Sequence, residues 1–516
     1  MIANARNPLS RRTCLAGSAT LAANAILPRL AHAQAPRGGT IRIAVLGLDT
    51  ADPHRHTGSI AVQQAYVETL TSIADDGTVK PFLAEGWELT PDGRTYTFRL
   101  RPGVAFHDGR TMTSADVKAN LERVRDRIRG GWLTSAMKSA TGIATPDDRT
   151  LVLELKAPYA PLLNLLSELW IVSPNSPGWN ETITRPIGTG PFMFGEWVPK
   201  QKLVAPAHQR YWQVGLPRAA AVEFDLRDAE DNSLPLRAGD LHVGRVSHES
   251  AAALARDPQF KVQFLKDTTW WFWSFNNRRP RPPFDDLRVR EAVACMLDKR
   301  AYMDFIAGEA GVVTNQMAAP GNFHWDEAMH QADRHAKPDP SRARSLLREV
   351  GVDPARVQMR IVSWQEDYTQ IAVQAMRTLG FQVEHLALDD IGAQRRLGQY
   401  DWDLAPMSSG PRADVFLRYV RLMSDGPNPV LWGGVQDPEF DRMVNEAVAT
   451  VDDKARRLVY LRAWQRAIDR YYTVVVGHAP NALAVRAGLA GFTTGFTWAQ
   501  HRVDGGLAFA SLSGAS

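Results

Sequence analysis

The chain has few cysteines and none of the common catalytic signature motifs. Only two of its 516 residues are cysteines, Cys14 and Cys295, so no disulfide framework is expected. Cys295 lies in the apolar run 293–297, which predicts a buried structural thiol rather than a nucleophile. No GxSxG, HExxH, Walker A or CxxC motif is present. The sequence therefore contains no constellation that indicates catalysis.

An excess of charge of one sign is also missing from most of the chain. Residues 1–33 contain four arginines and no acidic residue, which leaves 56 basic and 56 acidic residues in the remainder. The formal charge of +4 for the whole chain therefore comes from its first residues. It does not indicate a nucleic-acid partner.

The first residues resemble an export signal. Arg11-Arg12 precedes the apolar run 14–27, and Ala31-His32-Ala33 offers small residues for cleavage. The run is too short and too rich in Ala and Gly for a good membrane span. We predict a signal over residues 1–33 that resembles a twin-arginine (Tat) signal, with cleavage near Ala33 and release into the periplasm. Cys14 stands where Phe is common, so the Sec route stays open, and its place before Leu-Ala-Gly does not fit a lipid anchor.

The roughly 480 residues that remain are too many for one hydrophobic core, so two or more domains are expected. A strand is predicted over 40–45 and a helix over about 60–72. In the strand 95–100, Tyr96, Phe98 and Leu100 share one face. Thr113 and Asp116 are spaced as a capping box for the next helix. The turn Pro146–Thr150 leads into a second strand of the same kind, which indicates antiparallel structure.

The second half of the chain has a different pattern. The aromatic run 269–275 predicts a strand with Trp271 and Trp273 on one face and Trp270 on the other. Between 339 and 405 helical and strand patterns alternate, which predicts βαβ units and a mostly parallel sheet. The last strands are expected over 473–476 and 483–486.

Two strings of fixed positions carry a family resemblance. The first is FLAEGWELTPDGRTYTFRLRPGVAFHDGRTMTSADV, from Phe82 to Val117. The second runs from Pro283 to Ala292, PFDDLRVREA, with Asp298-Lys299 after it. The segment Pro186–Phe192, PIGTGPF, adds a third match. The chain resembles the extracytoplasmic solute-binding proteins of ABC importers, family 5, which includes the oligopeptide-, dipeptide- and nickel-binding proteins.

The resemblance implies an α/β, two-lobed periplasmic binding protein fold of class II, in the large cluster with an extra β-rich subdomain, with the ligand in a cleft between the lobes. The expected division of the chain is as follows: signal, 1–33; first lobe, 36–79, 186–268 and 477–516; subdomain inserted in the first lobe, 80–185; second lobe, 269–476.

The resemblance also implies a set of ligand-binding residues: Thr57, Gly58, Trp270, Trp271, Ser409, Gly410, Arg412, Asp414 and Trp432. Peptide-binding members use an aspartate after Ala to hold the ligand's α-ammonium, and that role falls to Asp414. Pro411 stands where the peptide-binding members usually have Trp, and no acid-Pro pair follows. This departure from the family pattern argues against a free peptide as the ligand. Arg412 is suited to binding a carboxylate or phosphate of the ligand. Alternatively, Arg412 and Asp414 form an exposed ion pair within the loop.

The expected function is capture of a small solute in the periplasm and its delivery to the transmembrane subunits of an ABC permease, without catalysis or a cofactor, by a monomer that closes about a hinge. A di- or oligopeptide is the first choice of ligand; an opine, a sugar-phosphate conjugate or a metal chelate are alternatives. A periplasmic hydrolase on the same scaffold is the hypothesis from another class. His54 and His56 lack a third ligand, so no metal site is expected.

Overall fold

The computed structural model describes residues 38–45, 47–55, 60–75, 77–128, 132–227, 229–265, 269–364, 368–410, 412, 414–426, 429–493 and 504–512. Within these ranges, none of the helices combines the length and apolar character that crossing a bilayer requires.

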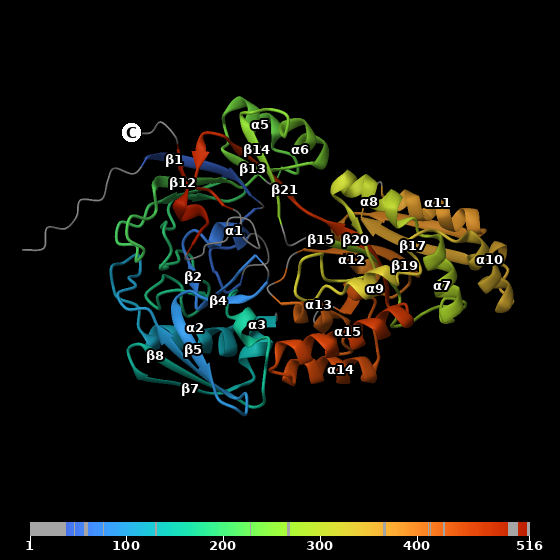
Figure 1. The fold of residues 1–516 in the computed structure, drawn as a ribbon, viewed down its shortest axis with the longest axis horizontal. Coiled ribbons are helices and arrows are strands. Elements are labelled where there is room, and N and C mark those ends of the chain that lie inside the picture. The colour runs from blue at the N-terminus through green and yellow to red at the C-terminus, as the bar shows by residue number, and fades with distance from the viewer. Residues whose placement is uncertain are drawn as a thin grey trace, which may run out of the picture. The chain divides into compact units, whose positions relative to one another are not determined.

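The first large sheet has seven strands and contains the first strand of the described chain (Figure 1). Its order is β10 (Trp197–Val198), β11 (Lys202–Pro206), β12 (Ala219–Asp225), β1 (Gly38–Ala44), β13 (Val243–Val246), β21 (Ala482–Arg486) and β14 (Phe260–Phe264). The predicted first strand is confirmed as β1, which pairs in parallel with β12 and β13.

The second large sheet has six strands and is mixed. Its order is β16 (Val312–Val313), β20 (Thr473–Ala479), β15 (Thr269–Phe275), β19 (Leu404–Ser409), β17 (Gln358–Trp364) and β18 (Gln382–Leu388). β17 pairs in parallel with both of its neighbours, β18 and β19. The predicted βαβ units of the region 339–405 are confirmed by these parallel pairs. The sheet as a whole is not mostly parallel, because β15, β20 and β16 from outside that region add antiparallel pairs.

Helices cover both faces of this second sheet, as Figure 1 shows. One core cluster joins Trp273 and Phe275 to α7 (Leu287–Met296), α8 (Lys299–Ala307), α10 (Pro340–Glu349) and α11 (Thr369–Leu379). Another joins Trp270 and Phe272 to α12 (Asp390–Gly398), α13 (Phe416–Tyr419), α14 (Pro438–Ala449) and α15 (Asp453–Asp469). The predicted alternation along β15 is confirmed, since Trp271 packs against the first cluster with Trp273.

A four-stranded antiparallel sheet contains the most specific sequence string. Its order is β5 (Ala84–Leu89), β6 (Thr95–Leu100), β8 (Thr150–Leu155) and β7 (Ala140–Asp147). Tyr96, Phe98 and Leu100 are all buried, as their alternation predicts. The helix α2 (Ser114–Arg127) follows, and the backbone N–H of Thr113 donates to Asp116 Oδ2 at 2.9 Å. The predicted return bond of the capping box is thus present.

The helix predicted over 60–72 is wrong beyond its first turn. Helix α1 (Ile60–Gln63) is followed by the short strands β2 (Glu68–Thr69) and β3 (Thr71–Ile73). β2 pairs with β9 (Trp170–Ile171) and β3 with β4 (Val79–Pro81). Short apolar runs rich in β-branched residues do not distinguish helix from strand by period alone, and pairing with a distant strand decides this one.

Glycines in the segment 186–192 allow a close backbone approach. A Cβ on Gly188 would lie 1.8 Å from the carbonyl oxygen of Tyr66, and one on Gly190 would lie 2.7 Å from that of Ala65. Gly190 N–H donates to Tyr66 O at 3.2 Å. These glycines therefore fix the segment against the end of α1.

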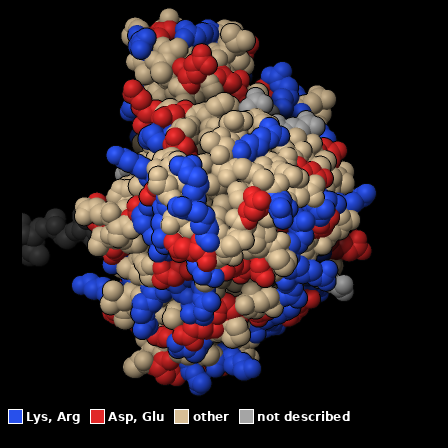
Figure 2. Space-filling view, turned by 90° about the vertical axis from the view of Figure 1, so that its right-hand side faces the viewer, with Lys and Arg blue, Asp and Glu red and all other residues tan. Residues whose placement is uncertain are grey.

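The remaining elements are short: α3 (Trp132–Met137), α4 (Leu162–Leu165), α5 (Ser233–Ala238), α6 (His248–Leu254), α9 (Glu327–Gln331), β22 (Leu489–Ala490) and β23 (Ser511–Leu512). Two connections join the two large sheets, one from β14 to β15 and one from β20 to β21. On the face drawn in Figure 2, basic and acidic side chains are interspersed, in keeping with the balanced charge of most of the chain.

Candidate functional site

The segment that follows β19 places Asp414 in a largely enclosed position. Asp414 Oδ1 accepts the backbone N–H of Phe416 at 2.7 Å, which fixes the start of α13. Only 3% of Asp414 is exposed, and within the described part of the chain the N–H of Phe416 is the one hydrogen-bond donor to its carboxylate. A buried carboxylate with so few donors is costly unless a further donor or cation approaches it.

Asp414 and Arg412 both line a cavity of about 360 Å³. One wall comes from the β-rich region and carries Trp87, Leu89 and Tyr96. The other comes from the region of the second sheet and includes Asn322, Phe323, His324, Val415, Val451, Asp453 and Arg456. The cavity thus combines apolar walls with a few convergent charged and polar groups, as ligand sites do.

The electrostatics around Asp414 favour a positively charged or donating group. Burial raises the pKa of Asp414, while the charge of Arg456 and the hydrogen bond from Phe416 lower it less strongly. Arg456 itself is paired with Asp453 at 2.8 Å. Burial and the charges of Arg456 and Arg457 lower the pKa of His324 to about 3, so that ring is neutral. Its Nδ1 is buried and has no hydrogen-bond partner in the part of the chain that the structure describes.

Basic side chains gather on the chain that follows Asp414. The Arg418 guanidinium carbon lies 5.8 Å from the centroid of the Trp270 ring, and that of Arg421 lies 5.2 Å from the Trp432 ring. Arg418 donates to the carbonyl oxygens of Met317 and Gly410. Burial and the charges of Arg412 and Arg418 lower the pKa of Arg421 to about 9. This group of cations is suited to the negative group of a ligand.

The predicted ligand residues Trp270 and Trp432 lie together beneath these arginines. Their ring centroids are 5.6 Å apart, and Phe272 stacks on Trp270 at 4.2 Å. Trp270 is fully buried and Trp432 is 3% exposed. Both rings belong to the core around the second sheet, and the indole N–H of Trp270 is buried with no hydrogen-bond acceptor among the described residues. Whether either ring contacts a ligand stays a prediction.

The other predicted residues are more scattered. Ser409 pairs with Trp270 across the sheet, and its buried hydroxyl has no hydrogen-bond partner within the described ranges. Gly410 is half-buried. Trp271 lies on the opposite face of β15 and makes an edge contact with Tyr368 at 5.3 Å. Thr57 and Gly58 lie outside the described residues.

Sequence reasoning did not single out several residues of this cavity. His324 and Arg456 come from segments far from Asp414 in sequence, and no motif marks them. Trp87 and Tyr96 were assigned only structural roles, because the string that contains them reads as a hairpin. Their contribution could be found only from the packing of the β-rich region against the second region.

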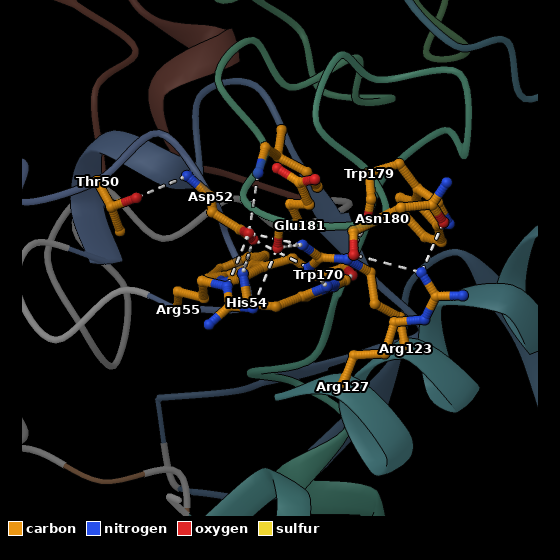
Figure 3. Close-up of polar contacts among 11 residues, drawn as sticks. Thr50, Asp52, His54, Arg55, Arg123, Arg127, Trp170, Trp179, Asn180 and Glu181 are labelled. Carbon is orange, nitrogen blue, oxygen red and sulfur yellow. Dashed lines mark hydrogen bonds and ion pairs between the residues drawn. The ribbon is translucent and has the colours of Figure 1, made fainter. Parts of the chain in front are cut away.

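A buried network holds the loop before α1 (Figure 3). Arg123 of α2 donates to both carboxylate oxygens of Asp52, at 3.0 and 2.6 Å, and lies 2.7 Å from His54 Nδ1. His54 Nε2 lies 2.8 Å from the carbonyl oxygen of Trp170. Both ring nitrogens of His54 thus have protein partners. Among the described residues, no group of His, Cys, Asp and Glu is arranged to hold a metal ion.

Cys295 is buried, as its sequence context predicts. Its Sγ lies 3.7 Å from His335 Nδ1. Burial, together with the charges of Glu291 and Asp339, raises the pKa of the Cys295 thiol to about 11. A thiol with a raised pKa is a poor nucleophile, so the structure gives it a packing role.

Comparison with known proteins shows the family. The model of bacterial extracellular solute-binding proteins, family 5, matches residues 78–427. The chain therefore belongs to this family, and the family resemblance predicted from the sequence is confirmed.

Individual relatives are more distant. The chain is 29% identical over 320 residues to the glutathione-binding protein GsiB of Salmonella typhi, a match that covers 58% of this chain and 59% of that protein. It is 25% identical over 467 residues to the nickel-binding periplasmic protein of Escherichia coli, covering 84% and 87%.

Solved structures show the same fold. The binding protein AgaA from A. tumefaciens R10, in complex with agropinic acid, is similar with a TM-score of 0.75 and 24% identity, over 92% of this chain and 99% of that one. The predicted two-lobed periplasmic binding protein fold is thus confirmed.

Proposed function

We propose that this chain is the solute-binding component of an ABC import system, which captures a small solute in the periplasm and delivers it to membrane permease subunits. Membership of family 5 supports this proposal. The observation that carries it is Asp414, a buried carboxylate that lines a cavity together with Arg412. In this account the protein binds its solute and does not alter it.

The proposed ligand carries an ammonium and a negative group. Asp414 faces the ammonium, because a buried carboxylate favours a nearby cation. Arg412, with Arg418 and Arg421 nearby, faces the carboxylate. A short peptide has both groups and is our first choice. The relative named for glutathione supports it.

A metal chelate is a second candidate. The relative named for nickel matches 84% of this chain, a longer stretch than the glutathione-binding relative does. The described residues contain no cluster that would hold a bare metal ion, so a metal would enter only within an organic chelator. The arginine group would then bind the acidic groups of that chelator.

We also propose how the chain is divided. Residues 1–33 act as an export signal that is removed near Ala33. The first lobe comprises 36–79, 186–268 and 477–516, with 80–185 inserted, and the second lobe comprises 269–476. The two connections between the large sheets support this division. The mature protein acts as a monomer.

The proposal is tested by releasing the bound solute from protein purified from the periplasm, by acid denaturation. Mass spectrometry of the released fraction is expected to show one unaltered small solute with an ammonium and an acidic group. Metal analysis of the same fraction distinguishes a chelate. Conversion of the identified solute into a product by the purified protein would instead support a hydrolase and contradict the proposal.

A further inference from the structure

A second cavity lies within the region of the second sheet, apart from the one that holds Asp414. Its volume is about 150 Å³, the size of a cavity that takes a molecule such as benzene. Side chains from the start of α8, the segment 332–335 after α9, helix α15 and the beginning of β20 line it. The described residues that line it are all different from those that line the cavity of Asp414.

Three polar side chains on this lining keep unused hydrogen-bonding capacity. Thr473 is 5% exposed, and its hydroxyl has no hydrogen-bond partner among the described residues. The same holds for the buried Oδ1 of Asn315, whose amide nitrogen instead donates to the carbonyl oxygen of Met329. Lys299 is 1% exposed, and its ammonium makes one hydrogen bond within the described ranges, to Asp333 Oδ2 at 2.7 Å, although it has three donors. Because unpartnered buried polar groups are costly, these positions favour a molecule with both an acceptor and a donor.

The charges around this cavity balance. Lys299 pairs with Asp333, and Arg334 Nη2 lies 3.7 Å from Asp469 Oδ1. Burial and the charges of Lys299 and Arg334 lower the pKa of His335 to about 4, so this ring is neutral at pH 7. A charged ligand would add a buried charge without a counter-charge. The cavity therefore suits an uncharged molecule.

Apolar side chains form another part of the lining. They are Met329, Trp464, Ile468 and Val475. The indole N–H of Trp464 donates to the carbonyl oxygen of Asn315 at 2.8 Å, which fixes the ring. A ligand with a short hydrocarbon part beside its polar group matches this combination of walls.

We propose that this cavity is a second ligand site, which binds a small uncharged amide, in addition to the solute site of the proposed function. The amide carbonyl oxygen accepts from Lys299 and Thr473. The amide N–H donates to Asn315 Oδ1, and the alkyl group packs against Trp464 and Ile468. The inference does not depend on which solute the first site captures.

The test compares propionamide with propionate, which has nearly the same shape and a negative charge. In NMR titrations the wild-type protein is expected to bind propionamide with a Kd of about 1–10 mM, in keeping with its few non-hydrogen atoms. Propionate is expected to bind about 10-fold more weakly or less. Thr473→Val keeps the shape of the side chain and removes its hydroxyl, and is expected to weaken propionamide binding about 2- to 10-fold.

A second variant closes the entrance. Ala332 is exposed and also lines the cavity, so it lies at the mouth, and Ala332→Phe is expected to weaken propionamide binding about 10-fold or more. Ala328 is an exposed residue of α9 outside the lining, so Ala328→Phe is the matched control and is expected to keep the wild-type Kd.

Three outcomes would overturn the inference and show that the cavity holds only water. They are a wild-type protein that does not bind propionamide, equal Kd values for propionamide and propionate, and a wild-type Kd for propionamide in either Thr473→Val or Ala332→Phe. Each of them leaves the proposed function standing, because these variants lie outside the cavity of Asp414.

Discussion

Individual buried charges set how this protein responds to pH, and Glu68 is the clearest case. Glu68 is fully buried, accepts the Tyr211 hydroxyl at 2.6 Å and the Trp212 indole N–H at 3.1 Å. Burial raises its pKa from 4.5 to about 7 in spite of these bonds. The folded state therefore holds a proton that the unfolded state has lost between these pH values.

From this we predict that Glu68 lowers stability as pH rises from about 4.5 to 7, by about 3 kcal/mol in total. Glu68→Gln keeps an acceptor for Tyr211 and Trp212 and removes the titration. Urea unfolding at pH 5 and pH 8 measures the free energy of unfolding at each pH. Between these two values, the fall in that free energy is expected to be smaller in Glu68→Gln than in the wild type. Glu85→Gln, at a side chain that is 41% exposed, serves as the control. An identical loss in wild type and Glu68→Gln would show that Glu68 does not titrate in this range.

At the scale of elements, one buried ion pair connects the loop before α1 to helix α2. Arg123 and Asp52 are both nearly inaccessible to solvent. Arg123 also lies over the ring of Trp179, 5.2 Å from its centroid. Burial opposes ionisation of Asp52, but the bonds from Arg123 and Ile183 lower its pKa below the usual value.

Arg123→Met is predicted to destabilise the fold by about 3–5 kcal/mol, because the buried Asp52 carboxylate loses its two bonds from Arg123 and keeps the more exposed Arg55, 3.4 Å away, as its ion-pair partner. Arg125→Met on the same helix is the control, since Arg125 pairs with the half-exposed Asp126 and such pairs contribute at most about 1 kcal/mol. Chemical denaturation measures both. The double variant Asp52→Asn/Arg123→Met is expected to recover part of the loss. If Arg123→Met lowers the free energy of unfolding no more than Arg125→Met does, the buried ion pair does not stabilise the fold as proposed.

Local signals predicted many elements correctly, and distant pairing decided the rest. The strand 269–275 and the box of Thr113 with Asp116 follow from neighbouring residues, and both are present. The segment 60–72 carries no local signal strong enough to choose between helix and strand, and its pairing with β9 decided it.

The same limit applies to the site. Asp414 was identified because it lies next to a family motif, and its burial beside a cavity could not be predicted from the sequence. His324 and Arg456 reach that cavity from separate segments. Contacts between segments so far apart in sequence leave no periodic or motif signal in a single chain.

At the scale of the whole molecule, we predict that solute binding closes the two lobes about the connections between the large sheets. The cluster of Trp270 and Trp432 lies near the arginines of the candidate site. Binding is therefore expected to change tryptophan fluorescence. It should also raise the melting temperature, with about 2.7 kcal/mol gained when the solute is at 100 times its Kd.

Tryptophan variants locate this signal. Trp432→Phe is expected to reduce the fluorescence change. Trp179 lies against Arg123, so Trp179→Phe is expected to preserve the change. If Trp432→Phe shows the same fluorescence change as the wild type, another tryptophan reports binding. The same comparison with Trp271→Ala tests the ring on the opposite face of β15; unchanged affinity and fluorescence in that variant would remove Trp271 from the site.

The central claim is that Asp414 binds the ammonium of a captured solute. Its most direct test is calorimetric titration of the solute released from the native protein into wild type and Asp414→Asn, with Asp126→Asn as the control. We predict a loss of affinity of tens- to thousands-fold in Asp414→Asn, corresponding to about 2–5 kcal/mol, and none in the control. Because burial raises the pKa of Asp414, wild-type affinity should also weaken on acidification at a higher pH than for an ordinary carboxylate. Equal affinity in wild type and Asp414→Asn, with no such pH dependence, would contradict the account.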